Sequence, residues 1–291
     1  MSGIVTFNSA HRYNLDDNNK IETSNGMVYF SQDLDLMRRV LIKVTQIEGR
    51  NKNEINTALK KAMSEVRAMV AVEDERLNIP RIHNTFFDEK ELKLYVVMEF
   101  IKGQNLKQLM NTASEENFIR WMAEIAKILS TLEKKRIYHK DIKPDNIMIG
   151  PKNEAYLIDF DISVSTPNQY EGTMFYKAPE MDRGSAYPGR DKVDMFSLGV
   201  IMYEFYTGKL PKRPIDYSAD ASVFSWKKFI EPKEKNPGMN SFANDCIVKC
   251  MKMNPKERYR DNNELAAQLY DLLRRIRSDG KSARNARTDG T

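Results

Sequence analysis

The 291-residue sequence is poor in cysteine and has no long apolar run. Its two cysteines, Cys246 and Cys250, stand four residues apart in a segment expected to be helical, and this spacing does not suit a disulfide. We therefore expect reduced thiols and a cytoplasmic protein. No apolar run approaches the roughly 20 residues that span a bilayer. Residues 1–15 also lack the basic start and apolar core of a secretory signal.

An excess of charge of one sign is absent from most of the chain. The net charge is +5, but residues 274–291 hold six basic and two acidic residues, which leaves about +1 for the remainder. We expect residues 278–291, rich in Gly, Arg and Asn without an apolar face, to form a basic disordered tail. Such a tail could contact the phosphates of nucleic acid or of anionic lipid. The absence of aromatic residues for base stacking argues against nucleic acid.

Glycine is scarce as well, with 13 residues, and the sequence offers little for a phosphate-binding loop. What it does offer is a polar loop in residues 138–160, YHKDIKPDNIMIGPKNEAYLIDF. Asp141, Lys143 and Asn146 lie within six residues, and Pro144 excludes a regular helix there.

Two short apolar strands, 147–149 and 156–158, follow this loop, and the second ends at Asp159. A loop, a hairpin and an aspartate at a strand end would bring Asp141, Asn146 and Asp159 together. A carboxylate and a carboxamide are oxygen donors suited to Mg²⁺. A second carboxylate can accept a hydroxyl proton, and a lysine can stabilise a phosphoryl group. The alternative interpretation is a polar surface turn.

The motif HKDIKPDN followed by DFD resembles the catalytic loop and metal-binding triplet of the eukaryotic-like Ser/Thr protein kinases. The resemblance covers roughly residues 13 to 275. It implies that Asp141 is the catalytic base and that Lys143 contacts the transferred phosphate. It also implies that Asn146 and Asp159 hold Mg²⁺, with Mn²⁺ as an alternative metal.

The resemblance also implies an ATP site. Lys43 in RRVLIKVT corresponds to the lysine that binds the α- and β-phosphates, and Glu65, on a helix expected over 53–72, would pair with it. Glu54 is a competing partner. Gly26 is the one glycine left of the three expected in the glycine-rich loop. The residues implied around adenine are Val28 and Leu41 above it, Met148 beneath it, Met98 beside it, and the backbone of Glu99 to Ile101. Plain core packing is the alternative for these apolar side chains.

Supporting residues follow from the same resemblance. His139 would support the loop from behind, Asp194 would tether its backbone, and Phe160 would pack near the Glu65 helix. Glu180 of the APE motif would pair with Arg258, and Thr173 would help to admit a Ser or Thr hydroxyl. Two positions depart from the family pattern: Lys140 replaces an arginine and Asp161 replaces a glycine.

We therefore predict a bilobal α+β protein-kinase fold over residues 10–276. A β-rich lobe (about 10–100) would precede a mainly helical lobe (about 104–276), with ATP between them. The expected reaction is transfer of the γ-phosphoryl of Mg-ATP to protein Ser or Thr hydroxyls, including autophosphorylation. The protein substrate and oligomeric state are not readable. One alternative is a pseudokinase that acts as a binding module, suggested by the missing glycines. Another is a small-molecule kinase, which the APE motif argues against.

Overall fold

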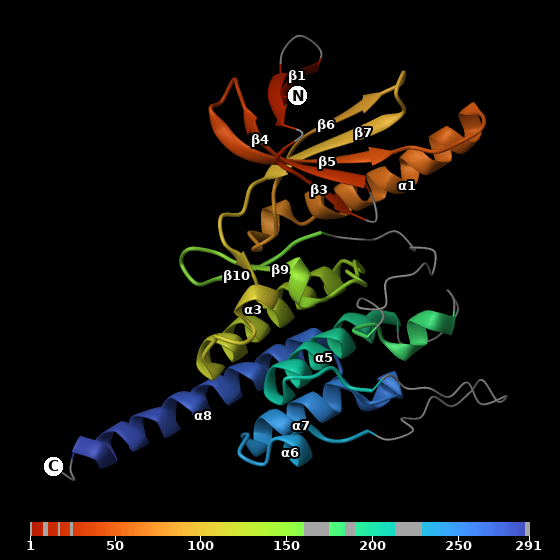
Figure 1. The fold of residues 1–291 in the computed structure, drawn as a ribbon. Helices are drawn as coiled ribbons and strands as arrows, with labels where there is room; N and C mark the ends of the chain where they lie inside the picture. The colour runs from red at the N-terminus through yellow and green to blue at the C-terminus, as the bar shows by residue number, and fades with distance from the viewer. Residues whose placement is uncertain are drawn as a thin grey trace. The chain divides into compact units, whose positions relative to one another are not determined.

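The computed structural model describes residues 2–7, 11–16, 18–23, 26–159, 175–183, 190–212 and 229–288 (Figure 1). At positions 2–11, 65, 74, 182, 183, 190 and 280–288 it describes the backbone alone. The chain divides into two compact units, one formed mainly by residues up to Lys102 and the other mainly by residues from Gly103 onward.

The first unit is an antiparallel sheet with one long helix. Its described part has seven strands in the order β1-β2-β4-β5-β7-β6, with β3 paired to β4. The strands are β1 (Ser2–Phe7), β2 (His11–Asp16), β3 (Lys20–Thr23), β4 (Gly26–Asp33), β5 (Arg38–Gln46), β6 (Ile82–Asp88) and β7 (Lys93–Glu99). The helix is α1 (Lys52–Val70), followed by the short 3-10 helix η1 (Glu73–Glu75).

The two faces of this sheet bury different residues because side chains alternate along each strand. One face carries a buried cluster made of Tyr13, Val40, Ile42, Tyr95 and Val97. The other face receives the apolar side of α1, which packs on a second cluster made of Ile47, Val66, Leu94 and Val96. The alternation in β5 therefore gives its odd-numbered positions, including 41 and 43, to the α1 side of the sheet.

The second unit is mainly helical. Its helices are α2 (Leu106–Leu109), α3 (Glu115–Lys134), α5 (Val193–Thr207), α6 (Pro232–Lys235), α7 (Ser241–Cys250) and α8 (Asn262–Thr288). A small sheet has the order β10-β9-β8, with β8 (Gln104–Asn105), β9 (Ile147–Ile149) and β10 (Ala155–Leu157). The 3-10 helices are η2 (Pro144–Asn146), η3 (Pro179–Arg183), η4 (Arg190–Lys192) and η5 (Pro255–Glu257).

Helix α5 forms the centre of the second unit. Every residue from Val193 to Tyr203 is buried, as its apolar sequence predicts. Gly199 lets α7 approach closely, because a Cβ atom there would lie 2.7 Å from the Cβ of Cys250. Cys246 and Cys250 are both buried free thiols. Within the described ranges, no helix combines the length and apolar character needed to cross a bilayer.

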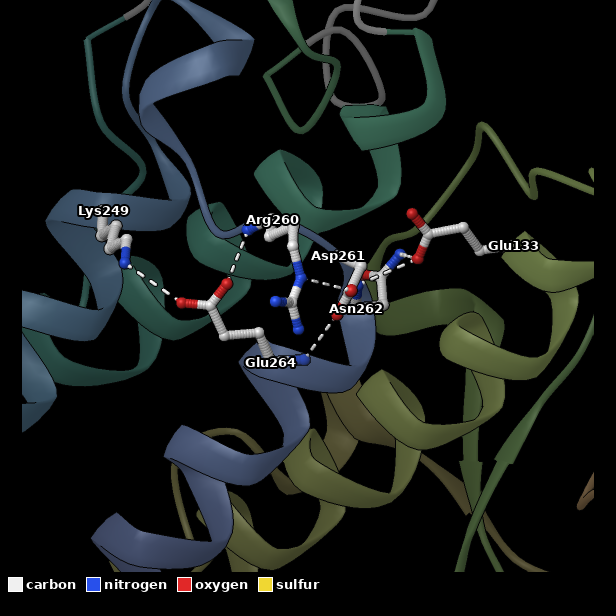
Figure 2. Close-up of polar contacts among 6 residues, drawn as sticks. All are labelled: Glu133, Lys249, Arg260, Asp261, Asn262 and Glu264. Carbon is white, nitrogen blue, oxygen red and sulfur yellow. Dashed lines mark hydrogen bonds and ion pairs between the residues drawn. The ribbon is translucent and has the colours of Figure 1, made fainter.

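A polar network closes the N-terminus of α8 (Figure 2). Asp261 accepts the N–H of Glu264 at 2.7 Å, and the carboxylate of Glu264 accepts the N–H of Arg260 at 2.8 Å. Lys249 of α7 lies 3.5 Å from the same carboxylate. These contacts satisfy N–H groups that the first turn of a helix leaves without partners.

Helix α8 runs antiparallel to α3 along its length. Asn262 donates from its backbone and its side chain to Glu133 near the end of α3, at 2.9 and 3.0 Å (Figure 2). Arg277 donates to Glu116 near the start of α3, at 2.8 Å. These polar contacts at both ends fix the register of the two helices.

The continuation of α8 to Thr288 corrects our prediction of a disordered tail from residue 278. Apart from Gly280, most residues after Ile276 tolerate a helix, and the packed part of α8 supplies the costly first turns. Arg274 and Arg275 both pair with Asp271, and Arg277 pairs with Glu116. Part of the tail's positive charge is thus already neutralised, which weakens the case for binding nucleic acid or anionic lipid.

The β-rich first unit and the helical second unit confirm the predicted α+β class. Strand β9 has the predicted bounds, whereas β1 and β6 were not predicted. A short helix expected near residues 223–229 falls almost entirely outside the described residues.

Candidate active site

The carboxylate of Asp141 is the centre of the polar loop before β9. Lys143 donates from Nζ to Asp141 Oδ2 at 2.7 Å, and Asn146 donates from Nδ2 to the same oxygen at 3.0 Å. Asn146 also donates to the carbonyl oxygen of Asp141 at 2.8 Å. Pro144 forces extended backbone on Lys143 and then opens the 3-10 turn that carries Asn146. The three predicted polar residues therefore meet at one carboxylate.

Asp194 of α5 holds the start of this loop. Its two carboxylate oxygens accept the backbone N–H groups of His139, at 2.8 Å, and of Lys140, at 2.7 Å. Lys140 has a positive φ of 66°, so its N–H position depends on a backbone geometry that is rare for non-glycine residues. Burial raises the pKa of Asp194, while the two N–H groups and the nearby His139 and Lys140 oppose that rise.

The buried ring of His139 joins the loop to β10. Its Nδ1 accepts the N–H of Asp141 at 3.4 Å, and its Nε2 lies 3.0 Å from the carbonyl oxygen of Ile158. Both contacts fit the neutral ring that carries its proton on Nε2. His139 thus occupies the supporting position that the resemblance implied.

Asp159 lies next to Asn146 because the N–H of Ile158 donates to the carbonyl oxygen of Asn146 at 2.9 Å. Asp159 is exposed and has a left-handed φ of 58°. The Nδ2 group of Asn146 faces Asp141, so its Oδ1 is the atom left to face elsewhere. One carboxylate and one carboxamide oxygen suit a hard divalent cation that keeps waters or phosphate oxygens. In the described part of the chain, no three His, Cys, Asp or Glu side chains form a complete cage for a metal.

Glu180 and Arg258 form the expected ion pair in the second unit. The guanidinium donates to both carboxylate oxygens, at 2.6 and 2.9 Å, and both side chains are buried. Arg258 also donates to the carbonyl oxygens of Lys192 and Lys252 and stacks on Phe196, with its Cζ 4.9 Å from the ring centroid. The segment that ends in APE is thereby fixed to the core.

Four residues implied for ATP share one face of the first unit's sheet. Val28 pairs with Lys43 between β4 and β5, and Leu41 pairs with Met98 between β5 and β7. Residues opposite each other in an antiparallel pair point to the same side, as do residues two apart on one strand. Lys43 therefore stands on the α1 side of the sheet, beside the apolar side chains expected at adenine.

Glu54, the competing partner of Lys43, is used elsewhere. Its carboxylate accepts the N–H of Arg50 at 2.8 Å and the side-chain amide of Asn51 at 2.8 Å, which closes the start of α1. Glu65 lies further along the same helix, but its side chain is outside the described residues. Glu65 therefore stays the predicted partner.

Gly26 starts β4 at a close approach between strands. Its φ is 127°, and a Cβ atom there would lie 2.1 Å from the carbonyl oxygen of Val44. Glycine is thus required by the fold at this position, whatever its role toward phosphate.

The remaining predicted residues are divided between described and undescribed segments. Ile101 is buried at the end of the first unit, the backbone of Glu99 is paired with Val40, and Met148 lies in β9 of the second unit. Phe160, Thr173 and Asp161 lie outside the described residues, so their predicted roles stay predictions.

The sequence analysis missed one polar contact near the site. Tyr176 donates from its hydroxyl to Glu204 of α5 at 2.5 Å, and burial, the first cause, together with this carboxylate raises the pKa of Tyr176 far above its ordinary value. The contact anchors the residues just before APE. A polar residue in the apolar sequence of α5 was the available signal, as it was for Asp194.

Comparison with known proteins agrees with this arrangement. The family described as protein kinase domain matches residues 22–270. A probable serine/threonine-protein kinase of Clostridium acetobutylicum is 30% identical over 278 residues, which cover 89% of this chain and 40% of the relative. An Aurora/IPL1-related protein kinase 2 of Caenorhabditis elegans is 34% identical over 188 residues, covering 62% and 59% of the two chains. Serine/threonine-protein kinase PrkC of Bacillus subtilis is 24% identical over 257 residues, covering 83% and 38%. This chain thus spans less than two thirds of the length of these relatives. Because the family match covers most of the sequence, the chain belongs to the protein kinase domain family.

Proposed function

We propose that the chain is a serine/threonine protein kinase that transfers the γ-phosphoryl group of ATP to hydroxyl groups of proteins, its own included. The observation that carries this proposal is the convergence of Lys143 and Asn146 on the carboxylate of Asp141. Membership of the protein kinase family implies the use of ATP and a divalent metal. The names of the clostridial and Bacillus relatives favour Ser and Thr as acceptors.

Asp141 acts on the acceptor hydroxyl. Its Oδ2 is held by Lys143 and Asn146, while its Oδ1 has no hydrogen bond among the described residues. An acceptor hydroxyl can therefore donate to Oδ1, which orients the oxygen for attack and takes its proton as the bond to phosphorus forms. The side chain is about 15% exposed, so a substrate can reach it.

Lys143 and the metal ligands balance negative charge. The ammonium of Lys143 can shift from Asp141 to an oxygen of the phosphoryl group in flight. Asn146 and Asp159 would hold Mg²⁺, which supplies positive charge to the phosphate oxygens when bound. We assign Mg²⁺ rather than Mn²⁺ because both donors are hard oxygens, and activity measured with each metal in turn tests that assignment.

The first unit binds the nucleotide. Lys43 would pair with the α- and β-phosphates, and Val28, Leu41 and Met98 on the same face would contact adenine. The N–H of Glu99 is already donated to the carbonyl oxygen of Arg81 at 2.9 Å. The N–H of Ile101 has no partner in the part of the chain that the structure describes, so we assign Ile101 as the adenine donor.

The cellular location that we propose is cytoplasmic. Its support is the chemistry of Cys246 and Cys250, two buried free thiols whose pKa values burial raises. The acceptor proteins are not defined by the sequence or by these contacts.

Phosphoryl transfer from labelled Mg-ATP, followed by phosphoamino-acid analysis, tests the proposed function. The expected result is label on Ser or Thr of the chain or of an added general acceptor such as casein. Lys43→Ala should lose the label, whereas Lys102→Ala, at an exposed position of the same unit, should keep it. Label on Tyr alone would overturn the Ser/Thr assignment. Binding of Mg-ATP without any transfer would favour the pseudokinase alternative.

A further inference from the structure

A cation–π contact lies where the first unit's sheet meets residues 99–101. The guanidinium Cζ of Arg39 stands 3.9 Å from the centroid of the Phe100 ring. The ring of Phe30 meets Phe100 edge-on, with centroids 6.2 Å apart and planes at 76°. We call these three side chains the Arg39–Phe100 clamp.

The strand register explains why these residues meet. Val40 pairs with Glu99, so the next position on each strand sets Arg39 opposite Phe100, one residue beyond the end of β7. Phe30 pairs with Leu41 on the same face of the sheet. The clamp therefore forms the row next to Leu41, the residue assigned to adenine.

Arg39 is available for this contact alone among the described residues. It is exposed, and no described carboxylate pairs with it. A guanidinium over an aromatic face contributes attraction without neutralising its charge. An arginine that served solubility alone would have no need to lie flat on a ring.

The backbone beside Phe100 is held from the other side as well. Glu99 donates its N–H to Arg81 at 2.9 Å, and its carboxylate accepts the N–H of Arg81 at 3.3 Å. Contacts to β6 and to β5 thus hold residues 99 and 100 in one conformation. A binding segment that is already ordered loses less conformational entropy when its ligand binds.

We infer that the Arg39–Phe100 clamp positions the backbone of residues 99–101 for adenine, which makes Arg39 a positioning residue for ATP. The inference rests on the proposed function. It predicts that the clamp affects ATP affinity and leaves phosphoryl transfer at saturating ATP unchanged, because Asp141 and Lys143 are untouched.

Calorimetric titration with Mg-ATP tests the inference. Arg39→Ala and Phe100→Leu should each weaken binding by about two- to fivefold, the range expected for one exposed cation–π contact. The double variant should bind no more weakly than the weaker single variant, since both remove the same contact. Arg12→Ala serves as the control, because Arg12 is an exposed arginine of the same unit that pairs with Asp35.

A second measurement separates positioning from general stability. Autophosphorylation at saturating ATP and the unfolding temperature without ligand should both stay at the wild-type value in Arg39→Ala. Unchanged ATP affinity in Arg39→Ala, or losses that multiply in the double variant, would overturn the clamp while leaving the proposed function intact. Failure of the wild-type protein to bind Mg-ATP would overturn both.

Discussion

Glu180 and Arg258, 78 residues apart, form a buried ion pair in which two N–H groups meet two carboxylate oxygens. A buried charge without its partner is costly because water no longer solvates it. The pair therefore explains how the segment that ends in APE is fixed to η5, far along the chain.

Loss of Arg258 should destabilise the protein strongly. Arg258→Met would leave the carboxylate of Glu180 buried and unpaired, at a cost of about 3–5 kcal/mol in the free energy of unfolding. Arg274→Ala, which removes an exposed pair with Asp271, should cost at most about 1 kcal/mol. Urea unfolding compares the two variants, and similar losses would contradict a special role for the buried pair.

Asp194→Asn should loosen the catalytic loop. A carboxamide offers one oxygen, so the N–H of either His139 or Lys140 would lose its acceptor, at a cost of about 1–3 kcal/mol. We expect lower kinase activity together with lower stability, measured by labelled ATP and by thermal unfolding. Asp279→Asn, at an exposed position of α8, should change neither, and full activity in Asp194→Asn would argue against the tether.

Gly26→Ala and Gly208→Ala form a matched pair. Both glycines have positive φ, but a Cβ atom would meet Val44 at position 26 and no atom within 4 Å at position 208. We expect a loss of about 2–4 kcal/mol for Gly26→Ala and of about 1–2 kcal/mol for Gly208→Ala, since only the first adds a collision to the backbone strain. Equal losses in urea unfolding would show that β4 moves away from β5 without penalty.

Glu124→Gln should stabilise the protein in a pH-dependent way. Burial, the largest cause, and the nearby Glu154 raise the pKa of Glu124 above its ordinary value of 4.5, while the N–H of Ala155 and the charge of Arg120 oppose the rise. Above pH 4.5 the folded state carries a carboxylate that burial disfavours, so the neutral amide gains stability there. The new amide could also donate toward Glu154, whose Oε2 has no hydrogen-bond partner.

The advantage of Glu124→Gln should shrink as the pH falls toward 4.5 and vanish below it, because the glutamic acid is then protonated in both folded and unfolded states. Thermal unfolding at pH 7 and at lower pH measures this. Glu91→Gln, at an exposed position, is the control. A gain that did not depend on pH would assign the effect to packing.

Local patterns predicted much of the site. Pro144 and the short apolar run of β9 gave the shape of the catalytic loop, and alternation in β5 gave the strand that carries Lys43. The resemblance then supplied long-range partners such as Glu180 and Arg258.

Contacts that depend on packing could not be predicted in this way. No local pattern joins Tyr176 to Glu204, or Arg39 to Phe100, because strand register and helix packing bring these pairs together. The choice between Glu54 and Glu65 also needed structure, since both are acidic residues on one helix, and only the contacts of Glu54 at the helix start remove it as a candidate. The extension of α8 was missed because composition describes an isolated tail and not one continuing a packed helix.

Comparison of Asp141→Asn with the wild-type protein tests the central claim most directly. Each protein is incubated with Mg-ATP and general acceptors, and phosphate addition is followed by intact mass. Asp145→Asn is the matched control, because Asp145 is an exposed acid of the same loop. We predict that the wild-type protein and the control gain phosphate, whereas Asp141→Asn still binds Mg-ATP but transfers at least about 100-fold more slowly. Transfer by Asp141→Asn at the wild-type rate would contradict the role given to Asp141, and absence of transfer by every protein would contradict the assignment as a kinase.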